Sequence, residues 1–113
     1  MYDIEKDAWE ANEEVQLQVA RSQSSACLFQ DNIIFVFGGY NKEMGTLNSI
    51  ERYDINLKKV TLLPDIKMPC PLRRFAAAKI SVTKILLIGG IGRLSKDSDS
   101  VYCFDCDDGV NGE

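Results

Sequence analysis

The stretch NIIFVFGG, Asn32–Gly39, decides the fold. Its apolar run Ile33–Phe37 is short, continuous and rich in β-branched and aromatic side chains, which is typical of a strand covered on both faces. The run stops at Gly38 and Gly39. We expect these glycines to end the strand where the backbone needs a positive φ or passes close to a neighbour. The stretch therefore predicts an inner strand of a sheet.

The same pattern occurs a second time further along the chain. Ile85–Gly90 reads ILLIGG, and Gly89 follows Gly38 by 51 residues (89 − 38). The same offset relates Tyr2-Asp3-Ile4 to Tyr53-Asp54-Ile55 and to Phe104-Asp105-Cys106, Ala26 to Ala77, and Ser49-Ile50 to Ser100-Val101. An internal period of about 50 residues indicates a repeat architecture such as a propeller.

These repeated residues resemble the kelch repeat, in which one strand ends in Gly-Gly, the next ends in Tyr-Asp, and a Trp opens the outermost strand. The matching motif residues are Tyr2 and Trp9, then Gly38, Gly39 and Tyr53, then Gly89, Gly90 and Phe104. The chain departs from the pattern at Val60, which stands where a Trp is expected. The resemblance spans Tyr2–Asp105. It implies an all-β fold made of kelch-like β-propeller blades, with about two four-stranded antiparallel blades of an incomplete propeller.

The repeat divides the chain into four parts. They are the end of a preceding kelch blade (1–10), a kelch repeat (11–63), a kelch repeat lacking its last strand (64–105), and an acidic tail that we expect to fray (106–113). We expect strands at 26–29, 33–37, 47–54, 59–63, 75–80, 84–88 and 100–105, with polar loops at 40–46 and 91–97. Three prolines in 64–71 exclude a helix or a central strand there.

Composition narrows the function classes. The 113 residues are 45% hydrophobic and 27% charged, as in a soluble globular protein. No apolar run approaches the roughly 18 residues of a membrane span, and the first residues do not resemble a signal peptide. We therefore expect no membrane association and a cytoplasmic location. A net charge of −4 weighs against nucleic-acid binding.

Metal and cofactor sites are not expected. The chain has no histidine, the commonest general base and transition-metal ligand. Cys103 and Cys106 spell CxxC, but a zinc site needs a second pair, so we interpret the four cysteines as free thiols. Asp105, Asp107 and Asp108 lack the spacing and the closing Glu of a calcium loop.

Function is expected in the loops, because strands bury their faces between blades. Partner contacts are predicted between the second and third strands (40–46 and 91–97) and between blades (10–21 and 64–74). The candidate partner-binding residues are Tyr40, Asn41, Lys42, Arg93, Arg21 and Arg74. Of the adjacent pair Arg73 and Arg74, we expect one to be solvated and one to pack its stem.

The resemblance implies a protein–protein interaction module or scaffold rather than an enzyme. Its relatives include substrate receptors of ubiquitin ligases and cytoskeletal binders. The alternative is a fragment of a propeller-fold enzyme such as a copper oxidase. A chain without histidine, however, lacks the imidazole ligands that the resemblance implies for such a copper site.

Two complete Gly-Gly units do not close a ring of the roughly four to eight blades that propellers have. We therefore expect further kelch blades beside this piece. They come either from the same longer chain, which we favour, or from other subunits, with the strand around Trp9 of one subunit completing the last blade of another.

Overall fold

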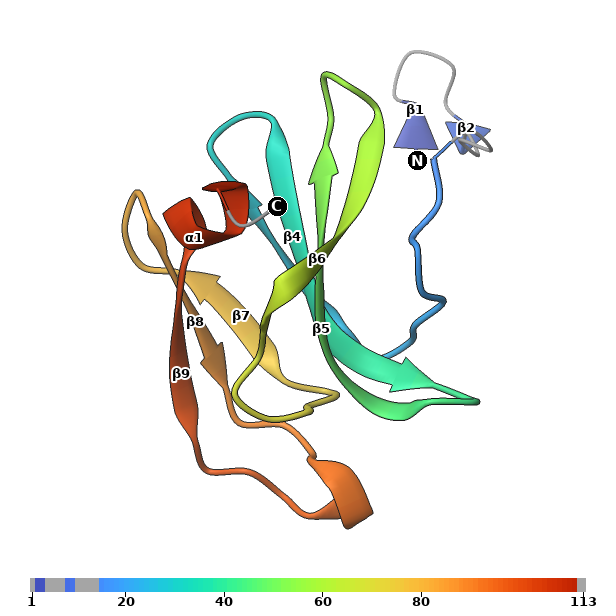
Figure 1. The fold of residues 1–113 in the computed structure, drawn as a ribbon, viewed down its shortest axis with the longest axis vertical. Helices are drawn as coiled ribbons and strands as arrows, with labels where there is room; N and C mark the ends of the chain where they lie inside the picture. Colours follow the sequence, from blue (N-terminus) through green and yellow to red (C-terminus); the bar gives the residue numbers. More distant parts are fainter. Residues whose placement is uncertain (1, 4–7, 10–14, 112–113) are drawn as a thin grey trace.

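The computed structural model describes residues 2–3, 8–9 and 15–111. Its elements are β1 (Tyr2–Asp3), β2 (Ala8–Trp9), β3 (Ser25–Phe29), β4 (Ile33–Asn41), β5 (Gly45–Asp54), β6 (Lys59–Lys67), β7 (Ala76–Lys79), β8 (Lys84–Ile88), the 3₁₀ turn η1 (Arg93–Ser95), β9 (Val101–Asp105) and α1 (Cys106–Asn111). Among these described residues the strands form antiparallel sheets in the orders β3-β4-β5-β6 and β7-β8-β9, with β1 and β2 as a separate pair (Figure 1). The all-β prediction of blade-like sheets is confirmed.

Strand pairing reproduces the 51-residue offset of the sequence. Equivalent pairs are Ile34↔Tyr53 and Ile85↔Phe104, Ala26↔Val36 and Ala77↔Leu87, Ser22↔Tyr40 and Arg73↔Ile91, and Tyr2↔Trp9 and Tyr53↔Val60. Val60 therefore takes the place of Trp9 without changing the register of the hairpin. The pairing of β1 with β2 is the pairing expected of the third and fourth strands of a blade.

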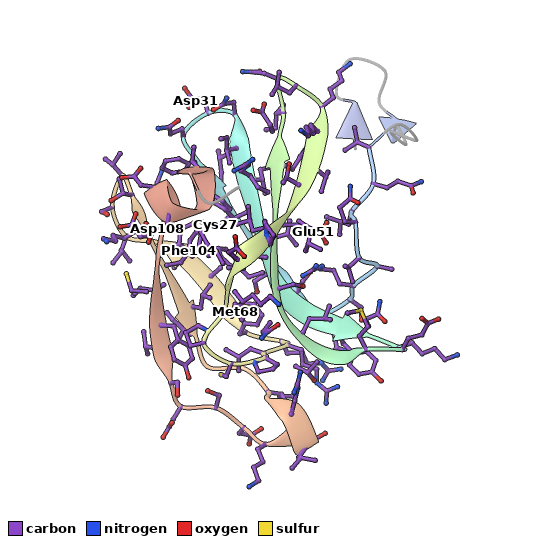
Figure 2. The ribbon with its side chains drawn as sticks, in the orientation of Figure 1. Cys27, Asp31, Glu51, Met68, Phe104 and Asp108 are labelled. Atoms are coloured by element: carbon purple, nitrogen blue, oxygen red, sulfur yellow. The ribbon has the colours of Figure 1, made fainter. Side chains whose placement is uncertain are left out.

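The two sheets pack through an aromatic core. The ring of Phe104 in β9 lies edge-on to those of Phe35 and Phe37 in β4, with 5.1 Å between centroids in each pair. Ile85 and Leu87 of β8 belong to the same buried cluster. Figure 2 shows Phe104 between the sheets. Because burying an aromatic side chain removes about 150–250 Å² from water, this contact stabilises the packing of one blade on the next.

The inner position predicted for Ile33–Phe37 is confirmed, but its burial is uneven. Phe35 and Phe37 are fully buried, whereas Ile34 and Val36 on the opposite face are half-buried. The reason is that the sheet β7-β8-β9 covers only one face of the sheet β3-β4-β5-β6. The strand was expected to be covered on both faces, and here only one face is.

The prediction that the glycines end this strand is wrong. Strand β4 continues to Asn41 across a β-bulge between Phe37 and Gly39. An extra residue at a bulge bends the strand and strengthens its twist. The polar loop expected at 40–46 is accordingly shorter: only Lys42–Met44 form the turn.

Gly39 and Gly90 do need to be glycine, as predicted. Their φ angles are +101° and +93°, which L side chains rarely adopt. A Cβ on Gly39 would lie 2.5 Å from the carbonyl oxygen of Ser22, and one on Gly90 would lie 2.8 Å from that of Arg73. The missing side chains let the segments that precede β3 and β7 approach Gly39 and Gly90 closely.

The outer strand of the first blade is longer than expected. Strand β6 runs to Lys67 and passes through Pro64. It lies at the edge of its sheet, where a missing N–H removes no ladder hydrogen bond, and the pairing with β5 is irregular between Ser49 and Glu51. The prolines thus exclude a central strand but not an edge strand.

The acidic tail does not fray at its start. Residues Cys106–Asn111 form helix α1, and the side chain of Cys106 is fully buried in the core. The backbone carbonyl of Val110 accepts a 3.0 Å hydrogen bond from Arg52 of β5, which ties the helix to the first blade. Residues 112 and 113 lie outside the described residues.

Candidate interaction surface

Two connections lie at the same end of the sheets. The turn Lys42–Met44 joins β4 to β5, and the segment containing η1 joins β8 to β9. Figure 1 shows both at one end of the molecule, with the β5–β6 and β7–β8 turns at the other end. The end carrying the turn and η1 is called the loop end below.

A pocket at the loop end combines residues of both blades. Its described lining consists of Tyr40, Met44, Gly45, Thr46, Arg73, Arg93, Leu94 and Ser95, and we call it the arginine pocket. The guanidinium carbon of Arg73 lies 5.2 Å from the ring centroid of Tyr40, within the range of a cation–π interaction. Nη2 of Arg73 also donates a 3.2 Å hydrogen bond to Oγ of Ser95. Arg73 therefore connects the two loops that the sequence placed in separate repeats.

The structure brings together two of the predicted partner-binding residues in this pocket. Tyr40 is half-buried under Arg73, and the exposed Arg93 lines the same pocket. Lys42 is exposed at the tip of the neighbouring turn and lines a second, adjoining pocket that also includes Tyr40. These three side chains share the loop end, as the repeat predicted.

Asn41 has a structural task at this site. Its Oδ1 accepts hydrogen bonds from the backbone N–H groups of Glu43 and Met44, at 2.9 and 3.0 Å, and its Nδ2 donates a 2.6 Å bond to the carbonyl of Ala20. Asn commonly stabilises turns through its own backbone in this way. Asn41 shapes the turn that presents Lys42.

The prediction that Arg21 is available to a partner is wrong, because its side chain has an exposed fraction of 0%. Its Nη2 lies 2.6 Å from Oε2 of Glu51, which is also fully buried, and its Nη1 donates to the carbonyls of Gly38 and Ser49. Glu51 accepts further bonds from the backbone of Gln18 and Val19. Figure 2 shows Glu51 on the side of the sheet facing this segment. The ion pair holds the chain that enters the first blade.

Arg74 and Arg73 divide as expected, but Arg73, and not the predicted Arg74, lines the arginine pocket. Arg74 is exposed and its Nε donates a 3.1 Å bond to the side chain of Gln23, away from the lining of the arginine pocket. Arg73 is half-buried over Tyr40. The repeat gives no signal for this contact, because the 51-residue offset makes Arg73 equivalent to Ser22 and pairs it with Ile91, not with Tyr40.

One ion pair lies at the opposite end of the second sheet, where β8 begins and β9 ends. Nζ of Lys84 is 2.9 Å from Oδ2 of Asp105. The hydrogen bond to Asp105 raises the pKa of Lys84, and the same bond, followed by the backbone N–H of Asp107, lowers the pKa of Asp105. Both side chains are partly exposed to water, so the pair contributes little to stability.

The described residues hold neither a candidate metal site nor a helix that could span a membrane. In 2–3, 8–9 and 15–111, no group of three or more Cys, Asp or Glu side chains could hold a metal ion. No helix in these ranges is long and apolar enough to cross a membrane.

Comparison with known proteins bears on the repeat itself. Residues 21–66 match the family model described as the Kelch motif. The match begins at the buried Arg21 and ends inside β6, so it contains strands β3, β4 and β5 and most of β6. A comparison with curated proteins found no match.

Proposed function

Because residues 21–66 form a kelch repeat, we propose that this protein is an interaction module that binds a partner protein through its loop end. One observation carries the proposal: the arginine pocket, which Tyr40 of the first blade and Arg73 and Arg93 of the second form together. Kelch repeats generally serve as protein-interaction modules. The pocket is where the β4–β5 turn of the first blade and η1 of the second blade meet.

The residue types at the loop end suit a protein interface. Tyr and Arg are among the side chains that most often dominate binding energy. Two large apolar side chains stand in solvent beside them, Met44 with an exposed fraction of 61% and Leu94 with 89%. Exposed apolar groups next to arginines supply the mixture of apolar and charged contacts found at interface centres.

The proposal accommodates the two roles that the family resemblance implies, a substrate receptor of a ubiquitin ligase and a cytoskeletal binder. Both require recognition of a protein surface without chemistry on it. We place binding ahead of the copper-oxidase alternative because a chain without histidine has no imidazole to offer copper.

We further propose that additional blades cover the outer faces of this pair. Phe35 and Phe37 are buried because the second blade packs on them, but the equivalent side chains of the second blade are less covered: Leu86 is half-buried and Ile88 is 40% exposed. On the opposite side of the first blade, Leu28 is 47% exposed. Each blade of a ring covers the next, so both faces are suited to a neighbouring blade.

Site-specific crosslinking tests the proposed surface. A photo-reactive amino acid is placed at Lys42, at the loop end, or at Val82, which is 72% exposed in the connection between β7 and β8 at the opposite end. We expect a partner protein to crosslink to position 42 and not to position 82, and Tyr40→Ala to suppress that product. Crosslinking only at position 82, or a position-42 product that Tyr40→Ala leaves unchanged, would contradict the proposed surface.

A further inference from the structure

We infer that the arginine pocket binds an acidic segment of the partner, with one carboxylate held between Arg73 and Arg93 and an adjacent apolar side chain against Leu94 and Met44. This inference rests on the proposed function and adds the chemistry of the occupant. Three features of the pocket support it: the charge of the lining residues, the unpaired donors of Arg73 and Arg93, and the conformation of the η1 segment.

The pocket is positively charged in a negatively charged chain. The chain has a net charge of −4, yet among the described residues lining the pocket two are arginines and none is Asp or Glu. The acidic residues closest in sequence, Glu43 and Asp97, do not line it. Basic side chains concentrated in one concave site attract an acidic ligand, because the low-dielectric walls reduce screening by water.

Both arginines have donors to spare. Nε of Arg73 is buried without a hydrogen-bond partner among the described residues, although buried polar groups in proteins are normally paired. The side chain of Arg93 makes no hydrogen bond or ion pair with any described residue. Guanidinium groups have a planar fork of donors that fits a carboxylate with two parallel hydrogen bonds. The stacking of Arg73 on Tyr40 and its bond to Ser95 fix the position of that fork before a ligand arrives.

The apolar half of the site is presented by unusual backbone. Leu94 and Ser95 both have positive φ, +63° and +56°, a conformation uncommon for residues other than glycine. Such conformations cluster at binding sites, where the surrounding structure maintains them. Here the conformation leaves the side chain of Leu94 in solvent rather than in the core, beside the exposed Met44. An apolar side chain of the ligand, next to its carboxylate, would cover both Leu94 and Met44.

Peptide selection tests the inference on the full chain. Random 12-residue peptides displayed on phage are selected on the wild-type protein and on Arg93→Gln. The matched control is Arg74→Gln, which removes an exposed arginine next to Arg73 but outside the pocket. We expect the wild type and the control to enrich peptides in which Asp or Glu adjoins Leu, Ile or Phe, and Arg93→Gln to lose that enrichment.

Synthetic peptides then identify the charged group. One selected sequence is made with an amidated C-terminus, with and without Glu→Gln, because a side-chain carboxylate and a terminal carboxylate offer the same chemistry. We expect amidation to leave affinity unchanged and Glu→Gln, or Arg93→Gln in the protein, to weaken it by at least about tenfold, as for a hydrogen bond between charged groups. Arg73→Lys keeps the charge but loses the fork, and should also weaken binding.

The outcomes separate the two proposals. Selected peptides that Tyr40→Ala no longer binds but that show no excess of acidic residues, or that bind Arg93→Gln as well as the wild type, would overturn the acidic occupant and leave the binding surface standing. Loss of affinity on amidation alone would assign the site to a chain terminus and overturn the side-chain carboxylate. Failure to select any peptide that depends on Tyr40 would overturn both proposals.

Discussion

Gly39→Ala provides the sharpest test of how the blade is built. The new methyl group would lie 2.5 Å from the carbonyl oxygen of Ser22 and 2.9 Å from Cβ of Ser24, closer than real Cβ contacts. The backbone would also keep a φ of +101°, which disfavours any side chain. The Ser22 segment must therefore move away from the bulge in β4.

The cost can be estimated from these two terms. A left-handed conformation costs an L residue about 1–2 kcal/mol. Moving the segment breaks the two backbone hydrogen bonds between Ser22 and Tyr40, at 2.9 and 2.7 Å, each worth about 0.5–1.5 kcal/mol net. The free energy of unfolding should therefore fall by about 2–5 kcal/mol, a large part of the about 5–15 kcal/mol typical of a folded protein.

Gly89→Ala is the matched control. Gly89 also has a positive φ, +69°, but the nearest atom to an added Cβ is 3.6 Å away, so only the backbone term of about 1–2 kcal/mol applies. Urea unfolding followed by circular dichroism measures both variants. With a slope of about 2 kcal/mol per molar, Gly39→Ala should lower the midpoint by about 1–2.5 M and Gly89→Ala by less than about 1 M. Equal shifts would refute the close approach of Ser22 as the cause.

Three further outcomes are expected. Phe104→Ala should lower the free energy of unfolding by about 3–5 kcal/mol in a urea titration, because it empties the aromatic contact between the blades; a loss below about 1 kcal/mol would contradict that packing. Glu51→Gln leaves Arg21 buried without a countercharge and should cost about 3–5 kcal/mol. In a double-mutant cycle, Arg21→Met combined with Glu51→Leu should cost less than the sum of these two single changes, because no unpaired charge is left buried. Burial raises the pKa of Cys106 to about 11 from 9.0, so the contribution of its neutral thiol to the free energy of unfolding is complete below pH 9 and declines as the pH rises toward 11. Mass spectrometry after maleimide treatment at pH 8 should find the exposed Cys103 modified long before Cys106.

Much of the fold could be predicted because the repeat is a local pattern. Each apolar run, each Gly-Gly pair and each Tyr-Asp or Phe-Asp end can be recognised within a few residues, and the common offset of 51 fixes which strands are equivalent. The observed pairs Ile34↔Tyr53 and Ile85↔Phe104 are related by the same offset, since equivalent strands bury equivalent alternate side chains.

The candidate surface could be predicted only in part. Tyr40 and Arg93 were identified because both follow a Gly-Gly strand, and strands of equivalent repeats end on the same side. Arg73 could not be predicted, because its place in the pocket depends on its contact with the ring of Tyr40, a residue that lies 33 positions earlier in the chain (73 − 40).

The sequence by itself determined the repeat and the approximate positions of its strands, because these depend on the periodic placement of apolar side chains and glycines. Only the tertiary structure decided the environment of individual charged and terminal residues. Arg21 is buried because Glu51 in β5, 30 residues later in the chain, supplies its countercharge. Cys106 occupies the repeat position of Ile55, yet Ile55 enters a turn and Cys106 begins a helix packed on the core. Equivalent residues differ in this way because burial and pairing are set by neighbours distant in sequence.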